Sequence, residues 1–320
     1  MNAFMIMCHK NVGQVIRLAE RCITEKTDVY IHADTNMPQS EYDELEMYAR
    51  TRKGVYLTTK RYHGVLDTRS LCDIALEMVS CAKKKEKEMG GYRYFALLSG
   101  QDYLIKPMRW IEKELEENYP QPLIDCTPYA TTNWVYHKFA DHPLVLHYHR
   151  WINKLPKGLL RKCFRVTEII CRKVTRQLNL GVYKELCAKE VNLFGGSAWW
   201  ILPDQAIDYI LEEYEKNSTY VQTLLNKTNT PEETFFQIMT MQSPIAKMVD
   251  INPVDMVAQN CKTWAYFADE GKPFKGHPYV FTAGEYDKLK NSSAWIARKF
   301  DATVDSKILD LIDANLLNEE

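Results

Sequence analysis

The chain has 320 residues, enough for one large α/β domain or two smaller ones, and its 46% hydrophobic and 26% charged residues are ordinary for a folded protein. The formal net charge of −1 gives the whole molecule no bias toward nucleic acid, so we expect no nucleic-acid partner. No apolar run approaches the roughly 20 residues that span a bilayer, and the first run is too short for a secretory signal.

The first third of the chain alternates predicted strands and helices. Strand-like apolar runs occupy 4–8, 28–33, 55–58 and 94–98, and helical spacing of apolar residues occupies 12–22, 40–48 and 68–85. This order predicts a mostly parallel sheet with helices on both faces. Ligands bind beyond the carboxyl ends of such strands, and these ends carry His9, Asp34 and Asp102.

The stretch from 133 to 180 has a different composition, rich first in aromatic residues and histidines and then in basic residues. An apolar segment at 194–202 follows, and then predicted helices at 204–215, at 230–241 and near 306–317. There is no internal repeat and no low-complexity linker. We therefore expect a single domain over 1–320 with a basic and aromatic insertion at about 133–180.

Cysteine usage bears on the compartment. The nine cysteines are scattered, and none forms a C-x-x-C pair. An odd number without paired spacing favours free thiols in a reducing compartment and disfavours a zinc site. We expect a cytoplasmic protein.

Glu233 has two interpretations. Thr230, Pro231 and Glu233 match a helix start with a Thr N-cap, Pro at the first position and a capping box, which explains the carboxylate by structure alone. A carboxylate at a helix N-terminus is also kept ionised by the helix dipole, as a general base near neutral pH requires. On the residues alone capping is the favoured interpretation, and catalysis stays open.

The two aspartates beyond the predicted strands also leave alternatives open. Asp34 and Asp102 either accept hydrogen bonds from a ribose or uracil, or cap the turn that follows. The cations Arg298 and Lys299 either neutralise a diphosphate or lie solvated on the surface. The chain has no Asp-x-Asp triplet, through which many nucleotide-sugar enzymes hold a divalent metal.

A glycine pair precedes two tryptophans. The pair Gly195 and Gly196 allows close backbone approach or a positive φ, and an aromatic ring beside it suits stacking on a sugar. Side chains alternate along a strand, so we expect one of Trp199 and Trp200 in the core and the other exposed.

Six stretches together resemble the family of core-2 and I-branching β-1,6-N-acetylglucosaminyltransferases, which also includes peptide O-xylosyltransferases. They are 7–10, 30–34, 97–103, 196–199, 231–236 and 297–301, in the family's order. The resemblance implies a GT-A-like α/β fold, a UDP-sugar donor, an inverting mechanism and no metal or other cofactor.

The resemblance also implies roles for individual residues. The family's catalytic base falls on Glu233, its uridine-contacting Asp on Asp34 and its diphosphate-binding Lys on Lys299. A Trp and a Tyr that line the family's acceptor site fall on Trp264 and Tyr266.

Further candidates lie in or beside the matching stretches. We add His9, Asp102 and Arg298 to the donor-binding residues, and Ser197 and Trp199 to the acceptor-binding residues. The chain departs from the family at residue 232, which is Glu where Asp is common. It also lacks a clear match to a second diphosphate-binding Arg near 277–279, for which Arg298, Lys275 or the basic segment are substitutes.

The expected reaction is transfer of a sugar, N-acetylglucosamine in the first instance, from a UDP-sugar to a hydroxyl of a glycan or lipid-linked glycan. Eukaryotic members carry a membrane anchor that this chain lacks, so it looks like a bacterial member acting in surface polysaccharide synthesis. The alternatives are a xylosyltransferase of the same family and a non-catalytic glycan-binding protein on the same fold.

The segment 150–176 holds nine basic residues against one acid, Glu168. Aromatic and aliphatic residues are interleaved at helical spacing, which is typical of a helix lying in a membrane interface. We therefore expect peripheral contact with an anionic membrane at its inner face. The alternatives are a helix that packs its apolar stripe on the catalytic domain and a basic patch over the donor diphosphate.

Overall fold

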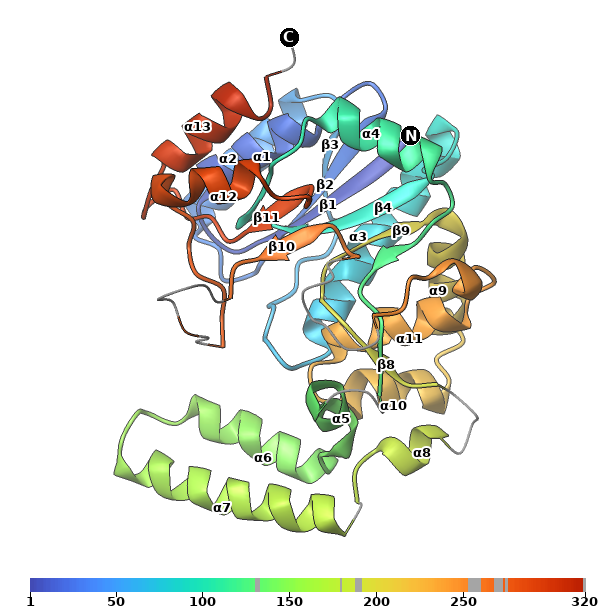
Figure 1. Ribbon diagram of the computed structural model, residues 1–320, viewed down its shortest axis with the longest axis vertical. Helices are drawn as coiled ribbons and strands as arrows, with labels where there is room; N and C mark the ends of the chain where they lie inside the picture. The colour runs from blue at the N-terminus through green and yellow to red at the C-terminus, as the bar shows by residue number, and fades with distance from the viewer. Residues whose placement is uncertain are drawn as a thin grey trace.

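The computed structural model describes residues 1–129, 133–178, 180–187, 192–252, 260–267, 273 and 276–318. Six strands form its central sheet in the order β3-β2-β1-β4-β9-β6 (Figure 1). Their bounds are β1 Asn2–Cys8, β2 Thr27–Ala33, β3 Val55–Leu57, β4 Tyr94–Ser99, β6 Leu123–Ile124 and β9 Trp200–Pro203.

The sheet is mostly parallel, as expected. β1 runs parallel to β2 and β4, and β2 runs parallel to β3. β9, which overlaps the apolar segment at 194–202, pairs antiparallel with both β4 and β6, and the sequence did not predict β6. The expected α/β fold is thus confirmed, with an antiparallel addition on one side.

Alternation along the strands builds a separate core on each face. Phe4 and Ile6 of β1 face one core, whereas Ala3 and Met5 face the other. Side chains from α1 (Val12–Cys22), α2 (Gln39–Thr51), α4 (Met108–Glu117), α12 (Tyr286–Lys290) and α13 (Lys307–Asn315) fill the first core. Side chains from α3 (Ser70–Met89), α9 (Asp204–Glu215), α10 (Thr219–Lys227) and α11 (Phe235–Gln242) fill the second core.

Two small sheets lie beside the central one. The first has the order β10-β11-β5, from Thr263–Ala265, Ile296–Arg298 and Asp102–Leu104. The second pairs β7 (Thr127–Pro128) with β8 (Phe194–Gly195). Three short 3-10 helices complete the elements: η1 Pro231–Glu233, η2 Ala246–Met248 and η3 Ala283–Glu285.

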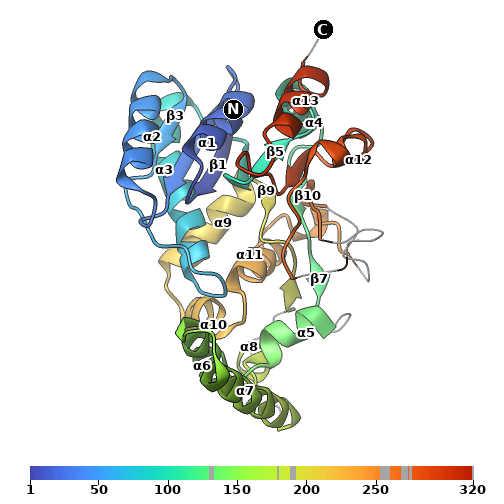
Figure 2. The same cartoon turned by 90° about the vertical axis from the view of Figure 1, so that its left-hand side faces the viewer.

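The insertion is helical. It contains α5 (Asn133–Ala140), α6 (Pro143–Lys154), α7 (Leu159–Gln177) and α8 (Tyr183–Cys187). We call α6 and α7 together the helical hairpin; both views place it at the end of the molecule opposite α4 and α13 (Figures 1 and 2). Val135 and Phe139 of α5 belong to a main core, whereas no hairpin residue does. No helix in the described ranges is both long enough and apolar enough to cross a bilayer.

Candidate functional site

Glu233 lies in η1, not in a capping box. The predicted helix at 230–241 is split: Pro231–Glu233 is a 3-10 turn and α11 begins only at Phe235. Thr230 has a φ of 51°, in the left-handed region, and its side chain caps no helix. The capping interpretation of Glu233 is therefore wrong, because this backbone conformation interrupts the helix that the carboxylate would have capped.

The carboxylate of Glu233 instead pairs with Lys138 of α5. The Lys138 ammonium also donates to the Thr230 hydroxyl at 2.5 Å, and the backbone carbonyl of Lys138 accepts from the Asn229 N–H at 2.9 Å. The Lys138 side chain is 5% exposed and that of Glu233 is 31% exposed. A buried ammonium thus holds a carboxylate that still reaches solvent.

The predicted glycine pair packs directly against this turn. The Gly196 N–H donates to the Glu233 carbonyl at 2.9 Å. A Cβ at Gly196 would lie 1.7 Å from the Asp125 carbonyl oxygen, and one at Gly195 would lie 3.3 Å from the Lys138 side chain. Position 196 therefore requires glycine because of the Asp125 carbonyl, and a side chain at 195 would crowd Lys138.

The neighbouring Glu232 faces inward. Its side chain accepts from the Asp67 N–H at 3.3 Å, and its second oxygen has no partner among the described residues. Burial raises the pKa of Glu232 to about 7, and the nearby charge of Glu233 acts in the same direction. Glu232 thus differs from Glu233 in having a desolvated carboxyl group.

Asp102, Arg298 and Trp199 come together although they are far apart in sequence. Pairing of β5 with β11 sets Asp102 opposite Arg298, with the Arg298 Nε 3.4 Å from the carboxylate. The Arg298 guanidinium lies 4.0 Å from the centre of the Trp199 ring, a cation–π contact. Trp200 is fully buried and Trp199 is not, which confirms the expected alternation.

This cluster is buried and incompletely hydrogen-bonded. Asp102 is 0% exposed, and burial raises its pKa to about 6 against the opposing effects of Arg298 and the Ser99 N–H. One carboxylate oxygen of Asp102, with Nε and Nη1 of Arg298, has no hydrogen-bond partner among the described residues. Such buried groups usually have partners, so a polar ligand or water would complete the cluster.

The next residue, Lys299, lies in a second group of cations. Burial, then the charges of Lys10 and Arg298, lower the pKa of Lys299, and Asp301 opposes them. The pKa of His9 is lowered in the same way, by burial and by Lys10 and Lys299. Asp301 bonds Lys10 at 2.6 Å. An anion bound here would relieve this repulsion.

Asp34 caps the turn that follows β2, which was one of its two interpretations from the sequence. Its carboxylate accepts from the N–H groups of Asn36 at 2.7 Å and Gly64 at 2.6 Å, and contacts the His63 ring at 3.1 Å. Burial acts to raise the pKa of Asp34, but these hydrogen bonds outweigh it and the pKa is lowered. Its side chain is 9% exposed, so the carboxylate chiefly holds the loop after β2.

The predicted acceptor-binding residues differ in how far they are exposed to solvent. Trp264 is partly exposed, and Ser197 accepts at its carbonyl from the Gln237 amide at 2.6 Å. Tyr266 is 1% exposed and stacks on Phe281 with ring centres 4.9 Å apart. The ring of Tyr266 thus packs in the core, and its role at an acceptor site stays a prediction.

Other predictions concern metals and thiols. Among the described residues no three His, Cys, Asp or Glu side chains are grouped as metal ligands would be. Eight cysteines in the described ranges are free thiols. Lys275, one substitute for the second diphosphate-binding cation, lies outside the described residues.

Two residues of the site were missed. Lys138 lies 95 positions from Glu233, and nothing in its local sequence distinguishes it from a surface lysine. Lys10 directly follows His9 at the end of β1, so the argument that selected His9 applied to it equally.

The chain is similar in sequence to two kinds of glycosyltransferase. A human protein named beta-1,3-galactosyl-O-glycosyl-glycoprotein beta-1,6-N-acetylglucosaminyltransferase is 23% identical over 98% of this chain and 69% of its own length. Xylosyltransferase 2 of Canis lupus familiaris is 23% identical over 98% of this chain, which spans 33% of that protein.

The solved structure of mouse xyloside xylosyltransferase 1 in its apo form has a TM-score of 0.35 and 10% identity, over 93% of this chain and 97% of its own. A likeness of that size supports no argument. The sequence model of the Core-2/I-branching enzymes matches residues 2–290. The chain therefore belongs to the Core-2/I-branching enzyme family and is a glycosyltransferase of that family.

Proposed function

We propose that the chain transfers a sugar from a UDP-sugar to a hydroxyl of a glycan acceptor, with inversion and without a metal, on a GT-A-like fold. The observation that carries the proposal is the Glu233–Lys138 pair, where a partly exposed carboxylate is fixed by a buried ammonium beside the Gly195–Gly196 turn. A general base has to be held in place and yet reach its substrate, and this pair meets both requirements.

The proposed reaction is a single displacement. Glu233 takes the proton of the acceptor hydroxyl while that oxygen forms a bond to the anomeric carbon. The bond from the anomeric carbon to the β-phosphate oxygen breaks, and UDP leaves with the electron pair. Attack from the face opposite the leaving group inverts the anomeric centre.

Positive side chains would balance the charge that develops on UDP. Lys299 is the proposed partner of the diphosphate, since its pKa is lowered by burial and by neighbouring cations, a repulsion that an anion removes. Arg298 is a positioning residue in this proposal, because its side chain is 13% exposed and its guanidinium contacts both Asp102 and Trp199. It would hold Trp199 for stacking on a sugar ring.

The proposed identities of the donor and the acceptor rest on the relatives of this chain more than on the geometry of the site. We propose N-acetylglucosamine as the transferred sugar and a glycan or lipid-linked glycan as the acceptor, supported by the human relative. Xylose is the alternative, supported by the xylosyltransferase relative. We also propose a role in bacterial surface polysaccharide synthesis and a cytoplasmic location, which the free thiols support.

A donor screen tests the proposal. A UDP-sugar that binds the folded state raises the melting temperature, whereas an unrelated nucleotide sugar does not. UDP release from the selected donor should then depend on Glu233. Glycan binding without UDP release under any donor would instead identify a non-catalytic binding protein.

A further inference from the structure

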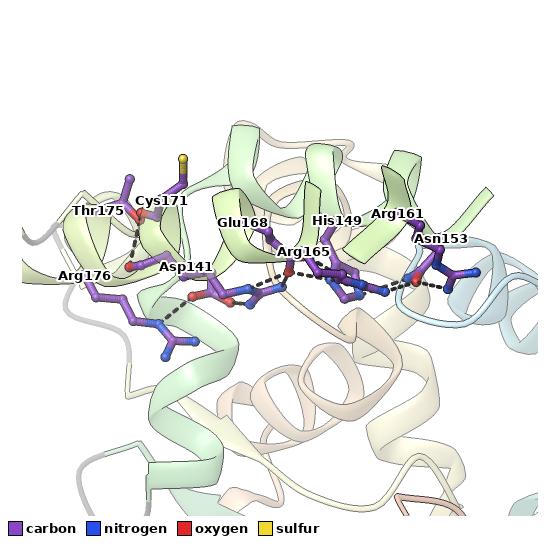
Figure 3. A network of polar contacts seen from close by, with 10 residues as sticks. Asp141, His149, Asn153, Arg161, Arg165, Glu168, Cys171, Thr175 and Arg176 are labelled. Carbon is purple, nitrogen blue, oxygen red and sulfur yellow. Dashed lines mark hydrogen bonds and ion pairs between the residues drawn. The ribbon is translucent and has the colours of Figure 1, made fainter. Parts of the chain in front are cut away.

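The interior of the helical hairpin is charged. Glu168 of α7 is 4% exposed and Asp141, directly after α5, is 0% exposed. Arg176 bonds Asp141 at 2.6 Å and Arg172 pairs with both acids (Figure 3). Arg165 bonds Glu168 at 2.6 Å. Buried ion pairs thus hold α7 to the end of α5, and Tyr148 and Trp151 of α6 contact Phe164 of α7 beside them.

The apolar residues of α7 point the other way. Six of them are between 46% and 79% exposed: Leu159, Leu160, Val166, Ile169, Ile170 and Val174. We call this row the outer face of the hairpin. The alternative in which the apolar stripe packs on the catalytic domain is therefore wrong, because the stripe faces solvent. A contiguous apolar surface of this kind on a folded protein marks an interaction site.

Lysine and arginine are segregated between the two faces. Arg161, Arg165, Arg172 and Arg176 are all partly buried, and each donates to an acid, an amide or a carbonyl of the hairpin or of Asp141. Lys154, Lys157, Lys162 and Lys173 are all exposed. Arginine suits bidentate pairing with buried acids, whereas lysine presents a solvated point charge. The four arginines of α7 thus hold the hairpin together, and the exposed lysines are left for a partner.

No acid accompanies these lysines. Glu168 is the only acidic residue between 143 and 180, and it is buried in the interior network. The surface of the hairpin in the described ranges therefore combines large aliphatic side chains with positive charge alone. A complementary partner has a negatively charged surface with an apolar layer beneath it.

We propose that the outer face of the hairpin, with Lys162 and Lys173, is a docking surface for an anionic lipid bilayer. The aliphatic side chains enter the boundary between headgroups and acyl chains, and the lysines contact anionic headgroups. A second copy of this chain is a poorer occupant, because it would bring lysine against lysine with no acid on either face.

The placement of the helix agrees with this role. The hairpin lies at one end of the molecule, away from α4 and α13, so those helices do not stand between the hairpin and a flat surface (Figures 1 and 2). α7 spans 19 residues and has no proline. It would lie parallel to the bilayer plane.

Vesicle co-sedimentation of the full chain tests the proposal. Wild type should sediment with vesicles of phosphatidylcholine and phosphatidylglycerol at low salt, less at high salt, and little with phosphatidylcholine alone. Lys162→Glu with Lys173→Glu should lower the partition coefficient by about 25-fold or more, since each lysine contributes about fivefold. Val166→Ser with Ile170→Ser should weaken binding even at low salt.

A matched control reverses two lysines far from the hairpin. Lys26→Glu with Lys113→Glu changes net charge equally at side chains 66% and 69% exposed near α4, and should bind vesicles as wild type does. Glu233→Gln should also bind normally, which separates this inference from the proposed chemistry. Equal loss in the control pair, or no binding of wild type to anionic vesicles at low salt, would overturn it. Dimerisation through the outer face without vesicle binding would overturn it as well.

Discussion

Replacing Glu233 by Gln removes the proposed base and should reduce kcat by about 10²–10⁴, the usual contribution of general-base catalysis. Gln has nearly the same shape and can still accept a hydrogen bond from Lys138. Any large loss of turnover therefore reports the carboxylate and not a displaced turn. UDP release from the selected donor, with acceptor present, measures it.

The same change also has a cost in stability that follows from the structure. It leaves the ammonium of Lys138, which is 5% exposed, without its negative partner. Breaking a fully buried ion pair costs about 3–5 kcal/mol, but Glu233 is 31% exposed and solvent screens the pair. We expect about 1–2 kcal/mol of lost unfolding free energy, measured by urea denaturation.

A double-mutant cycle isolates the pair. Lys138→Met removes the ammonium, and in the Glu233→Gln background it should recover part of the lost stability without restoring turnover. The Lys138→Met single variant should fold but turn over slowly, because its carboxylate is no longer fixed. A Glu233→Gln enzyme with kcat within a few-fold of wild type would remove Glu233 from the mechanism, and additive stabilities would refute the pairing.

Three further outcomes test the site. Burial raises the pKa of Glu232 from 4.5 to about 7, so the folded state binds this proton more tightly than the unfolded state does. The free energy of unfolding should therefore fall as the pH rises from 4.5 to about 7. Glu232→Gln should remove about 3 kcal/mol of this pH dependence, measured by urea denaturation across that range. Activity should survive EDTA without added Mn²⁺, and loss in chelator that metal restores would contradict metal independence. Lys299→Ala should weaken UDP binding by about 1.5–3 kcal/mol in calorimetry, and unchanged affinity would remove Lys299 from the donor site.

Long amphipathic segments were predictable. The helices at 12–22 and 204–215 match α1 and α9 at both ends, because their apolar periodicity extends over three turns. The strands β5, β10 and β11 have three residues each, too few to show a period. Their pairing sets Asp102 against Arg298, so that contact could not be derived from local sequence.

Two other failures have specific causes. The positive φ of Thr230 depends on its tertiary surroundings, and its residue type gives no warning of it. The periodicity of α7 predicts an apolar stripe but not the direction it faces, which here is set by the burial of Glu168 and Asp141. The contact of Lys138 with Glu233 is long-range, and a single sequence does not reveal it.

The end of α5 connects the proposed base to the proposed membrane-docking hairpin. Lys138 holds Glu233, and Asp141, three residues later, receives Arg172 and Arg176 from the hairpin. The chain returns at Gly181, where a Cβ would lie 2.5 Å from the carbonyl oxygen of Ala140. The segments that lead into and out of the hairpin therefore pack against each other beside the end of α5. The hairpin is therefore not a separable unit. A chimera that shortens or exchanges it has to preserve the contacts of Asp141 and Gly181, because loosening the end of α5 would also displace Lys138, the partner of Glu233.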